Sequence, residues 1–302
     1  IFNKNEVSVV QGDSSVGGYL ISLNFDHIFF TGSPEIGKVV MGEAAKNLTS
    51  VTLELGGKNH TVVDSNANIK SSAEKIIWSK YVNCGQTCIA VNHVFVHSAI
   101  YDDFITALKH TLDKFFENNS DYASVVNEKH FSRLQILQDQ CLDNGGRLYY
   151  QSPKSSQNNS FPLTLIQVKN WSNPILNSEV FGPILPIVKY TELDDVIDFI
   201  NSKEKALALY LFTKSKSKIS HFIKSTSSGT VAINECMLQY SNPYLLFGGV
   251  NNSGIGKVGR NRGFLAFSNE KSVLFQMSGF SVAKFIYPPY TSLKKKLAKL
   301  IR

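Results

Sequence analysis

The stretch "HIFFTGSPEIGKVVMGEAAKNL", from His27 to Leu48, decides the fold class. Its first part, His27–Ser33, is an apolar run of β-prone residues that ends in a glycine and a serine, which predicts a buried strand. Ser33 can cap a following helix, and Pro34 suits the first helical position because its missing N–H needs no partner there. A second apolar run, Ser50–Gly57, comes directly after the expected helix. The region therefore predicts a strand–helix–strand unit of an α/β fold.

Strand and helix patterns alternate along the rest of the chain, and no internal repeat is evident. The strands at the start are too few for a complete nucleotide-binding domain, so we expect only the last strands of a doubly wound sheet there. The polar run Ser152–Ser160 predicts a loop. Further strands are expected at Val7–Gly12, His93–His97, Pro183–Tyr190, Ala206–Thr213 and Gly229–Asn234. Helices are expected between the last three of these strands and at Ala67–Val82. Two more are expected along a face marked by Phe104, Ile105, Leu108, Leu112 and Phe115, and along another marked by Leu134, Leu137 and Cys141.

The composition is that of a folded protein. Of 302 residues, 43% are hydrophobic and 18% are charged, which allows a sizeable core and excludes a disordered chain. The formal charge is +7, but six Lys or Arg and no acidic residue lie between Phe280 and Arg302. The excess charge therefore marks a basic tail rather than a nucleic-acid face, and we expect no nucleic-acid partner.

Four unevenly placed cysteines predict reduced thiols in a cytoplasmic protein rather than a disulfide framework. No apolar run in the sequence reaches the length of a membrane span. The first residue is Ile rather than Met, so we expect the numbered chain to begin inside a longer protein.

Two of the cysteines, Cys84 and Cys88, lie four positions apart in "NCGQTC". They could be metal ligands, buried packing residues or a nucleophile with a neighbour. A zinc site usually needs four ligands, and His93 and His97 would lie roughly 13 Å apart along a strand, so we expect no metal site. A helix beginning near Cys88 would lower the pKa of its thiol and could hold an oxyanion. Cys84 is then expected to be a packing residue.

Glu54 ends the apolar strand in "LELGGK". A carboxylate buried there loses hydration, so its pKa should rise and it could serve as a general base. The alternative is a strand-end glutamate that points into solvent.

Five motifs occur in order: "FTGSPEIG", "LELGGK", "NCGQTC", "EVFGP" and "FGGVNNSG". Together they resemble the aldehyde dehydrogenase superfamily, most closely its class 3 and fatty-aldehyde branch, to which "KEKALALYLF" is also similar. The separation of Glu54 and Cys88, 34 positions, is that of the family. The resemblance extends from Val7 to the "YPP" near the end. It implies an aldehyde dehydrogenase-like α/β fold: the remnant of a doubly wound NAD-binding sheet plus an α/β catalytic domain.

The resemblance implies roles for the catalytic pair. Cys88 matches the nucleophile, whose thiolate attacks the aldehyde to give a thiohemiacetal held partly by its own backbone N–H. Loss of hydride to NAD or NADP leaves a thioester, and Glu54 matches the base that activates the hydrolytic water.

Cofactor and substrate residues are implied in the same way. Gly32, Ser33 and Gly37 match the family's phosphate-binding turn at the start of a helix. Glu179 matches the residue that bonds the nicotinamide ribose, and Phe181 the one beside the ring. Phe247 matches a wall of the substrate funnel and could equally be a core residue. Asn234 also fits the family pattern, with a structural role.

Two departures from the family pattern put the aldehyde preference in doubt. Asn59-His60 stands where Ser-Pro is usual, and "ECMLQYSNPYLLFGG" lacks the histidines common in class 3. The family's first half, with a second oxyanion donor and a lysine for the adenine ribose, would precede Ile1. The NAD or NADP preference is therefore also open.

We expect residues 1–56 to be the end of an NAD(P)-binding domain, 57–246 a catalytic domain, and 247–302 a C-terminal segment for the substrate funnel, oligomerisation and the basic tail. The expected function is oxidation of aliphatic or aromatic aldehydes by a homodimer. In the tail, Leu293, Leu297, Leu300 and Ile301 share a helical face opposite lysines. This face predicts weak contact with an anionic membrane surface, or else a terminal helix that is solvated or packs against another subunit. The alternatives are a truncated, inactive homologue that acts as an interaction partner, and a cofactor-independent thiol esterase.

Overall fold

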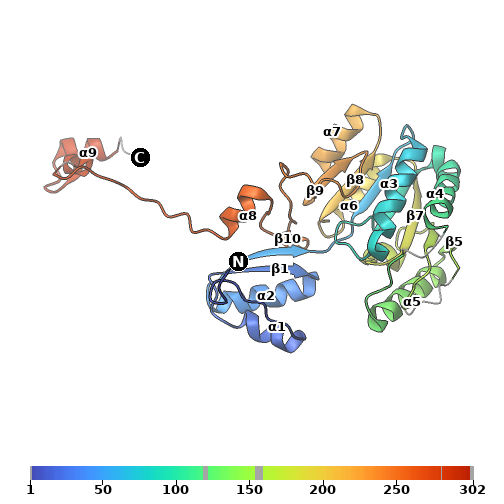
Figure 1. Ribbon diagram of the computed structural model, residues 1–302. Coiled ribbons are helices and arrows are strands. Elements are labelled where there is room, and N and C mark those ends of the chain that lie inside the picture. The colour runs from blue at the N-terminus through green and yellow to red at the C-terminus, as the bar shows by residue number, and fades with distance from the viewer. Residues whose placement is uncertain (1, 118–121, 154–158, 280, 300–302) are drawn as a thin grey trace. The chain divides into compact units, whose positions relative to one another are not determined.

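The computed structural model describes residues 2–117, 122–153, 159–279 and 281–299. The chain divides into two compact units, Ile1–Phe267 and Ser268–Arg302 (Figure 1). The helices of the first unit are α1 (Ser14–Ile21), α2 (Pro34–Lys46), α3 (Ile69–Tyr81), α4 (Tyr101–Phe116), α5 (Glu128–Asp143), α6 (Leu193–Asn201), α7 (Lys216–Ser225) and α8 (Arg260–Ala266). Its strands are β1 (His27–Gly32), β2 (Ser50–Leu55), β3 (His60–Val63), β4 (His93–His97), β5 (Arg147–Gln151), β6 (Thr164–Val168), β7 (Ile184–Tyr190), β8 (Ala208–Phe212), β9 (Thr230–Ile233) and β10 (Gly254–Ile255).

The smaller sheet has the strand order β1-β2-β10. β1 and β2 are parallel and are joined by α2, which the side chain of Ser33 caps by accepting from the Ile36 N–H. β10 comes from far along the chain and pairs antiparallel with β2, so that Gly254 lies opposite Glu54. Val40 of α2 and Leu53 of β2 are buried between helix and sheet. β1 forms the outer edge of this sheet, and no described strand pairs with its other side.

The larger sheet has seven strands in the order β5-β6-β7-β4-β3-β8-β9. All its neighbours are parallel except β5 and β6. Side chains alternate between its faces: Val94 and Val96 of β4 pack in one cluster with α3 and α4, while Phe95 packs in another with α5, α6 and α7. Helices therefore cover both faces, as an α/β fold with buried parallel strands requires (Figure 1).

The predicted fold class is confirmed, and so are the strands β1, β2, β4, β7, β8 and β9 and the helices α2, α3, α4 and α5. The strand expected at Val7–Gly12 is wrong, since those residues adopt no regular structure and Val9 is 85% exposed. Without a neighbouring strand to pair with, an apolar run does not form a ladder. Phe115 is also exposed, whereas the other four residues of its predicted face are buried. The helices expected between β7 and β8 and between β8 and β9 are also confirmed, as α6 and α7. The elements that the pattern did not predict are α1, β3, β5, β6, α8 and β10.

The loop predicted at Ser152–Ser160 lies partly outside the described residues. Where it is described, at Ser152–Pro153 and Asn159–Ser160, it contains no helix and no strand.

The second unit contains the helix α9 (Ser292–Ala298), and Leu293 there is exposed. Of the other residues on the predicted apolar face, Leu300 and Ile301 lie outside the described residues, and the side chain of Leu297 is not described. Among the residues that the structure describes, no helix combines the length and the apolar character needed to cross a bilayer.

Candidate active site

Glu54 lies near the end of β2, where the burial pattern of the strand puts its side chain inside the protein. It is only 6% exposed, so the solvent-facing interpretation is wrong. Neither carboxylate oxygen has a hydrogen-bond partner among the described residues. Burial raises the pKa of Glu54 to about 7, and the charge of Lys257 opposes that rise. A buried carboxyl group that is half ionised near neutral pH and has free lone pairs can accept a proton.

Cys88 lies in a turn between α3 and β4, in the stretch Gln86–Ala90. The helix that was expected to begin there is absent, so the prediction of a thiol activated by a helix N-terminus is wrong. Burial raises the pKa of Cys88, and the carboxylates of Glu179 and Glu54 raise it further. The backbone N–H groups of Cys88 and Ile89 face the sulfur and oppose this rise. The structure thus brings Cys88 near both glutamates.

Buried side chains hold the backbone of this turn at three consecutive carbonyls. The Asn59 amide donates to the carbonyl oxygens of Cys88 at 2.8 Å and of Ala90 at 2.9 Å, and the Tyr210 hydroxyl donates to that of Ile89 at 2.6 Å. Asn59 also accepts from the backbone N–H of Ala208 on β8. The peptide groups around Cys88 are therefore fixed to β8 and to Asn59, the residue directly before β3.

The residues just before the turn have a left-handed backbone conformation. Asn83, Cys84 and Gly85 all have positive φ, and Gly85 lies so close to the neighbouring chain that a Cβ there would be 2.4 Å from the carbonyl oxygen of Gly182. The amide of Gln86 donates to the carbonyls of Asn83 and Ser124 and accepts from the Val126 N–H. Cys84 is fully buried, as expected for a packing residue.

The candidate cofactor residues Glu179 and Phe181 lie on an irregular segment between β6 and β7. The carboxylate of Glu179 lies against Gly56, where a Cβ would be 2.3 Å from Oε2, and the Gly57 N–H faces it. Burial raises the pKa of Glu179 to about 7. Phe181 has a φ of +40° and is 37% exposed, so its ring remains available for contact.

Gly32, Ser33 and Gly37 lie where β1 passes into α2. Gly37 is buried against Leu55 of β2, and a Cβ there would be 2.7 Å from that side chain, so this glycine lets the helix pack closely on the strand. Glu35, in the first turn of the helix, raises the pKa of Glu179 by its charge. The start of α2 and the Glu179 segment are therefore neighbours.

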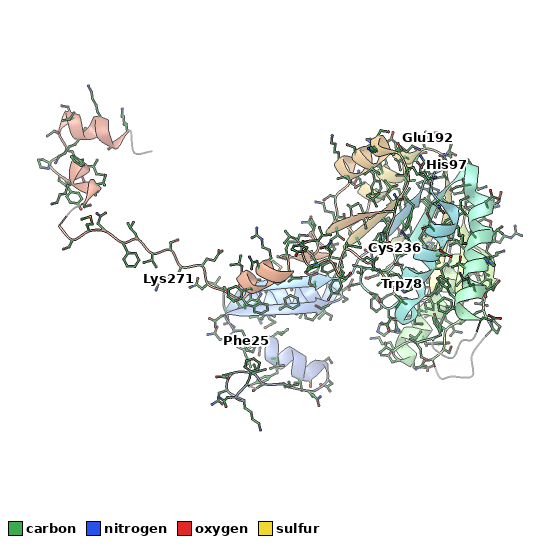
Figure 2. All side chains as sticks on the ribbon, turned by 45° about the horizontal axis from the view of Figure 1, so that its top comes forward. Phe25, Trp78, His97, Glu192, Cys236 and Lys271 are labelled. Atoms are coloured by element: carbon green, nitrogen blue, oxygen red, sulfur yellow. The ribbon has the colours of Figure 1, made fainter. Side chains whose placement is uncertain are left out.

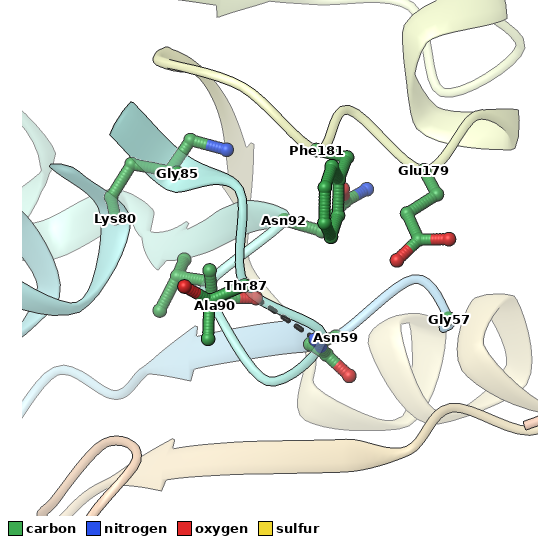
Figure 3. A pocket seen from close by; sticks show the side chains of 10 residues that line it. Gly57, Asn59, Lys80, Gly85, Thr87, Ala90, Asn92, Glu179 and Phe181 are labelled. Atoms are coloured by element: carbon green, nitrogen blue, oxygen red, sulfur yellow. Dashed lines mark hydrogen bonds between the residues drawn. The ribbon is translucent and has the colours of Figure 1, made fainter. Parts of the chain in front are cut away.

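A small cavity of about 10 Å³, room for about one water molecule, lies between the Cys88 turn and Glu179 (Figure 3). Thr87, Ala90 and Asn92 line it from the turn and the start of β4, and Glu179 and Phe181 from the other side. Lys80 of α3 also lines the cavity, and burial lowers the pKa of its amine to about 7.

Phe247 is 7% exposed and packs with the ring of Tyr240 at a centroid distance of 5.0 Å. It belongs to the core cluster against which Cys88 packs, so its ring lies both in the core and on the Cys88 side. Asn234 has a structural position, since its amide bonds both main-chain groups of Thr213.

His60 and His93, near the turn, form a buried pair. His60 Nδ1 and His93 Nε2 are 2.7 Å apart, and burial strongly lowers both pKa values. His97, by contrast, lies at the carboxyl end of β4, at the same end of the sheet as Glu192 (Figure 2). In the part of the chain that the structure describes, no three His, Cys, Asp or Glu side chains gather as metal ligands would.

The sequence profile of the Aldehyde dehydrogenase family matches residues 2–273.

The chain belongs to the aldehyde dehydrogenase family.

The rat protein "Aldehyde dehydrogenase family 3 member B1" is 38% identical over 290 residues, which is 94% of this chain and 61% of that protein. The rat protein "Aldehyde dehydrogenase, dimeric NADP-preferring" is 36% identical over 95% of this chain and 63% of its own length. The structure titled "Substrate bound state of Staphylococcus Aureus AldH" superimposes with a TM-score of 0.92 at 36% identity, over all of this chain and 66% of that one. The predicted resemblance and fold are confirmed, and the chain spans about three fifths of the length of these curated relatives.

The sequence pattern does not mark several residues that hold the main chain of this region. Asn59 was noted only as a departure from the family pattern, and its bonds to the Cys88 turn gave no local signal. The sequence pattern also gives no sign of Asn92, Arg133 and Lys257. Each forms hydrogen bonds with main-chain groups of residues outside its own helix or strand, which no local pattern shows.

Proposed function

We propose that this chain carries out NAD(P)-dependent oxidation of an aldehyde to a carboxylic acid, with Cys88 as nucleophile and Glu54 as general base. The observation that carries the proposal is the buried, unpartnered carboxyl group of Glu54 close to the thiol of Cys88. A hydrolytic site needs this combination of a sulfur nucleophile and a base with free lone pairs.

In this proposal Cys88 first loses its proton. Its pKa is raised, so the thiolate has to be formed by transfer to a neighbouring base, and Glu54 is the candidate acceptor. The thiolate attacks the aldehyde carbon, and the oxyanion of the thiohemiacetal is held by the backbone N–H of Cys88. The fixed peptide groups of the turn keep that N–H oriented.

The second half of the reaction depends on Glu54. Once the thiohemiacetal carbon has lost a hydride, the acyl group is a thioester on Cys88. Glu54 first releases to solvent the proton that it took from Cys88. The resulting carboxylate removes a proton from water as the water oxygen attacks, and the thiolate of Cys88 leaves. A base with a pKa of about 7 is well matched to this step near neutral pH.

The residues present fit a nicotinamide dinucleotide. Glu179 offers a partly buried carboxylate to a ribose hydroxyl, Phe181 an exposed ring face, and the capped start of α2 a place for phosphate. When bound, the cofactor supplies the hydride acceptor. Whether NAD or NADP is preferred is left to experiment, although one relative is named as NADP-preferring.

The further assignments are proposals of the same kind. The substrates would be medium or long aliphatic, or aromatic, aldehydes; the protein would be a cytoplasmic homodimer. Residues 1–56 would close the cofactor domain, 57–246 form the catalytic domain and 247–302 the C-terminal segment. The division at Gly56 coincides with the passage from the smaller to the larger sheet.

The test is NADH and NADPH formation from hexanal and benzaldehyde by the wild-type chain, by the Cys88→Ala variant and by Cys84→Ala as a control. We expect Cys88→Ala to lower the rate at least about 10³-fold, and Cys84→Ala by less than about tenfold because Cys84 is fully buried. No turnover by the wild-type chain would favour an inactive homologue. If no NADH or NADPH forms, cofactor-independent hydrolysis of p-nitrophenyl acetate that Cys88→Ala abolishes would favour the thiol esterase over the inactive homologue.

A further inference from the structure

The segment Ser178–Phe181, called here the cofactor segment, has no helix or strand hydrogen bonding of its own. It carries both candidate cofactor residues, and Phe181 adopts a positive φ that a phenylalanine rarely takes. A strained, irregular segment keeps one conformation only when its surroundings hold it. What holds this segment therefore decides where Glu179 and Phe181 lie.

Arg133, in the second turn of α5, donates to three consecutive carbonyls of the cofactor segment. Its guanidinium lies 3.4 Å from the carbonyl oxygen of Glu179, 2.8 Å from that of Val180 and 3.2 Å from that of Phe181. The guanidinium is planar and carries several N–H groups in a fixed fork, so one side chain can orient successive peptide groups. These contacts leave the Glu179 carboxylate itself unbonded by Arg133.

Asn92 holds the same segment from the other side. Its amide donates to the carbonyl of Ser178 at 2.9 Å and accepts from the N–H of Val180 at 2.8 Å, so its two bonds flank Glu179. The next residue after the segment, Gly182, packs on Leu134 of α5, where a Cβ would be 2.3 Å from that side chain. Arg133 of α5 and Asn92, directly before β4, therefore hold the segment from two sides.

We propose that Arg133 is the positioning residue of the cofactor segment: it fixes the main chain at Glu179–Phe181 and thereby the affinity for the nicotinamide cofactor. The proposal rests on the proposed function for its effect on the cofactor. The holding of the segment itself does not depend on it.

The experiment compares Arg133→Ala, Arg133→Lys and Lys129→Ala in the full chain. Lys129 lies on the same helix one turn away and is exposed, so it controls for loss of a positive charge. One readout is hydrogen–deuterium exchange of peptides covering Ser178–Phe181. The other is the separate measurement of kcat and of KM for NAD and for NADP.

We expect exchange in the segment to become at least about tenfold faster in Arg133→Ala, with peptides of α3 and β4 unchanged. The cofactor KM should rise at least about tenfold while kcat changes by less than about threefold. Arg133→Lys should lie between, because one ammonium cannot hold three carbonyls, and Lys129→Ala should match wild type.

Unchanged exchange in the segment, or exchange that rises equally throughout the chain, would overturn the proposal. An equal loss in kcat and in cofactor affinity would also overturn it, since that pattern indicates general damage. If the wild-type chain forms no NADH or NADPH, the proposed function fails, but the exchange measurement still decides whether Arg133 holds the segment.

Discussion

The carboxyl group of Glu54 combines burial with free lone pairs, which makes its ionisation responsive to pH near neutrality. Glu179 has a pKa raised to a similar value but a different environment, with the Gly57 N–H and Arg133 facing it. The two residues therefore allow a controlled comparison of catalytic and cofactor roles.

The first prediction concerns the Glu54→Gln variant. We expect the wild-type rate of thioester hydrolysis to rise with pH around a midpoint of about 7, because only the carboxylate accepts a proton. Glu54→Gln should lower that rate about 10²–10⁴-fold and remove the midpoint. Stopped-flow measurement of acyl-enzyme breakdown between pH 5.5 and 9 checks this. The control, Glu179→Gln, should keep the midpoint and raise the cofactor KM instead; a midpoint that survives in Glu54→Gln would contradict the assignment.

The ionisation of Glu54 also changes the free energy of unfolding, in a direction that follows from its raised pKa. Between its ordinary pKa of 4.5 and about 7, the unfolded chain releases the Glu54 proton while the folded chain keeps it. Stability therefore falls as pH rises through this window, and the loss is complete above about 7. Urea unfolding should show a smaller loss between pH 5 and 8 for Glu54→Gln than for wild type.

Asn59 gives a second prediction at the scale of a residue. Asn59→Ala leaves the buried carbonyls of Cys88 and Ala90 without their donor. We expect the free energy of unfolding to fall by about 1–3 kcal/mol. We also expect the thiol of Cys88 to be alkylated more slowly, or to lose its preference over the other cysteines. Asn177→Ala, at an exposed asparagine, should leave both quantities unchanged. Equal stability of Asn59→Ala and wild type would show that the turn is held without this amide.

At the scale of the elements, Gly85 is the point of contact between the left-handed residues before Cys88 and the main chain at Gly182. Two backbone oxygens, those of Gly182 and Lys80, lie 2.4 and 2.8 Å from where a Cβ of residue 85 would be. Backbone cannot move aside as a flexible side chain can. This glycine therefore couples the turn before Cys88 to Gly182, the residue that directly follows the cofactor segment.

We predict that Gly85→Ala is far more damaging than Gly145→Ala. Both glycines have positive φ, +71° and +84°, but no atom lies within 4 Å of a Cβ at Gly145. Gly145→Ala should cost about 1–2 kcal/mol from backbone strain alone. Gly85→Ala should cost clearly more and lower aldehyde oxidation at least about tenfold. Thermal unfolding and the oxidation assay measure the two effects, and equal destabilisation of both variants would exclude the proposed close packing.

Prediction from sequence succeeded for elements with a strong local pattern. β2 and β4 are apolar runs bounded by glycine or polar residues, and α2 has a serine cap with proline after it. β3 was missed because it is four residues long and follows a polar stretch, and β5 because its side chains are mostly exposed. The turn at Cys88 could not be predicted, since its shape depends on bonds such as that between Asn59 and Ala208, 149 positions apart.

For the site, the family pattern pointed to Glu54, Cys88 and Glu179, and the structure brings these three into electrostatic contact. It could not reveal the residues that hold their backbone. Arg133 and Asn92 act on carbonyl and N–H groups, which every residue has, so no side-chain motif marks their partners.

At the scale of the whole molecule, the second unit, Ser268–Arg302, concentrates positive charge. In α9, Lys294, Lys295 and Lys296 follow the exposed Leu293. A surface lysine near an anionic bilayer contributes about 1 kcal/mol, so three of them amount to roughly a hundredfold in binding.

We predict that the full chain cosediments with phosphatidylserine vesicles at low ionic strength and that a chain ending at Phe267 does not. Changing the three lysines of α9 to glutamine should weaken binding at least about tenfold. Phosphatidylcholine vesicles and 0.5 M salt serve as controls, because neither sustains an electrostatic attraction. Binding that persists in the truncated chain would assign the contact to another surface and leave the tail as a solvated helix.

The side of β1 that no described strand pairs with has a consequence for the handling of the protein. Unsatisfied main-chain groups along a strand edge can recruit a like strand from a second molecule, and the half-exposed Phe29 adds an apolar surface there. The turbidity of a solution should therefore rise steeply with protein concentration. Storage at low concentration, or the Phe29→Lys substitution, should prevent this rise.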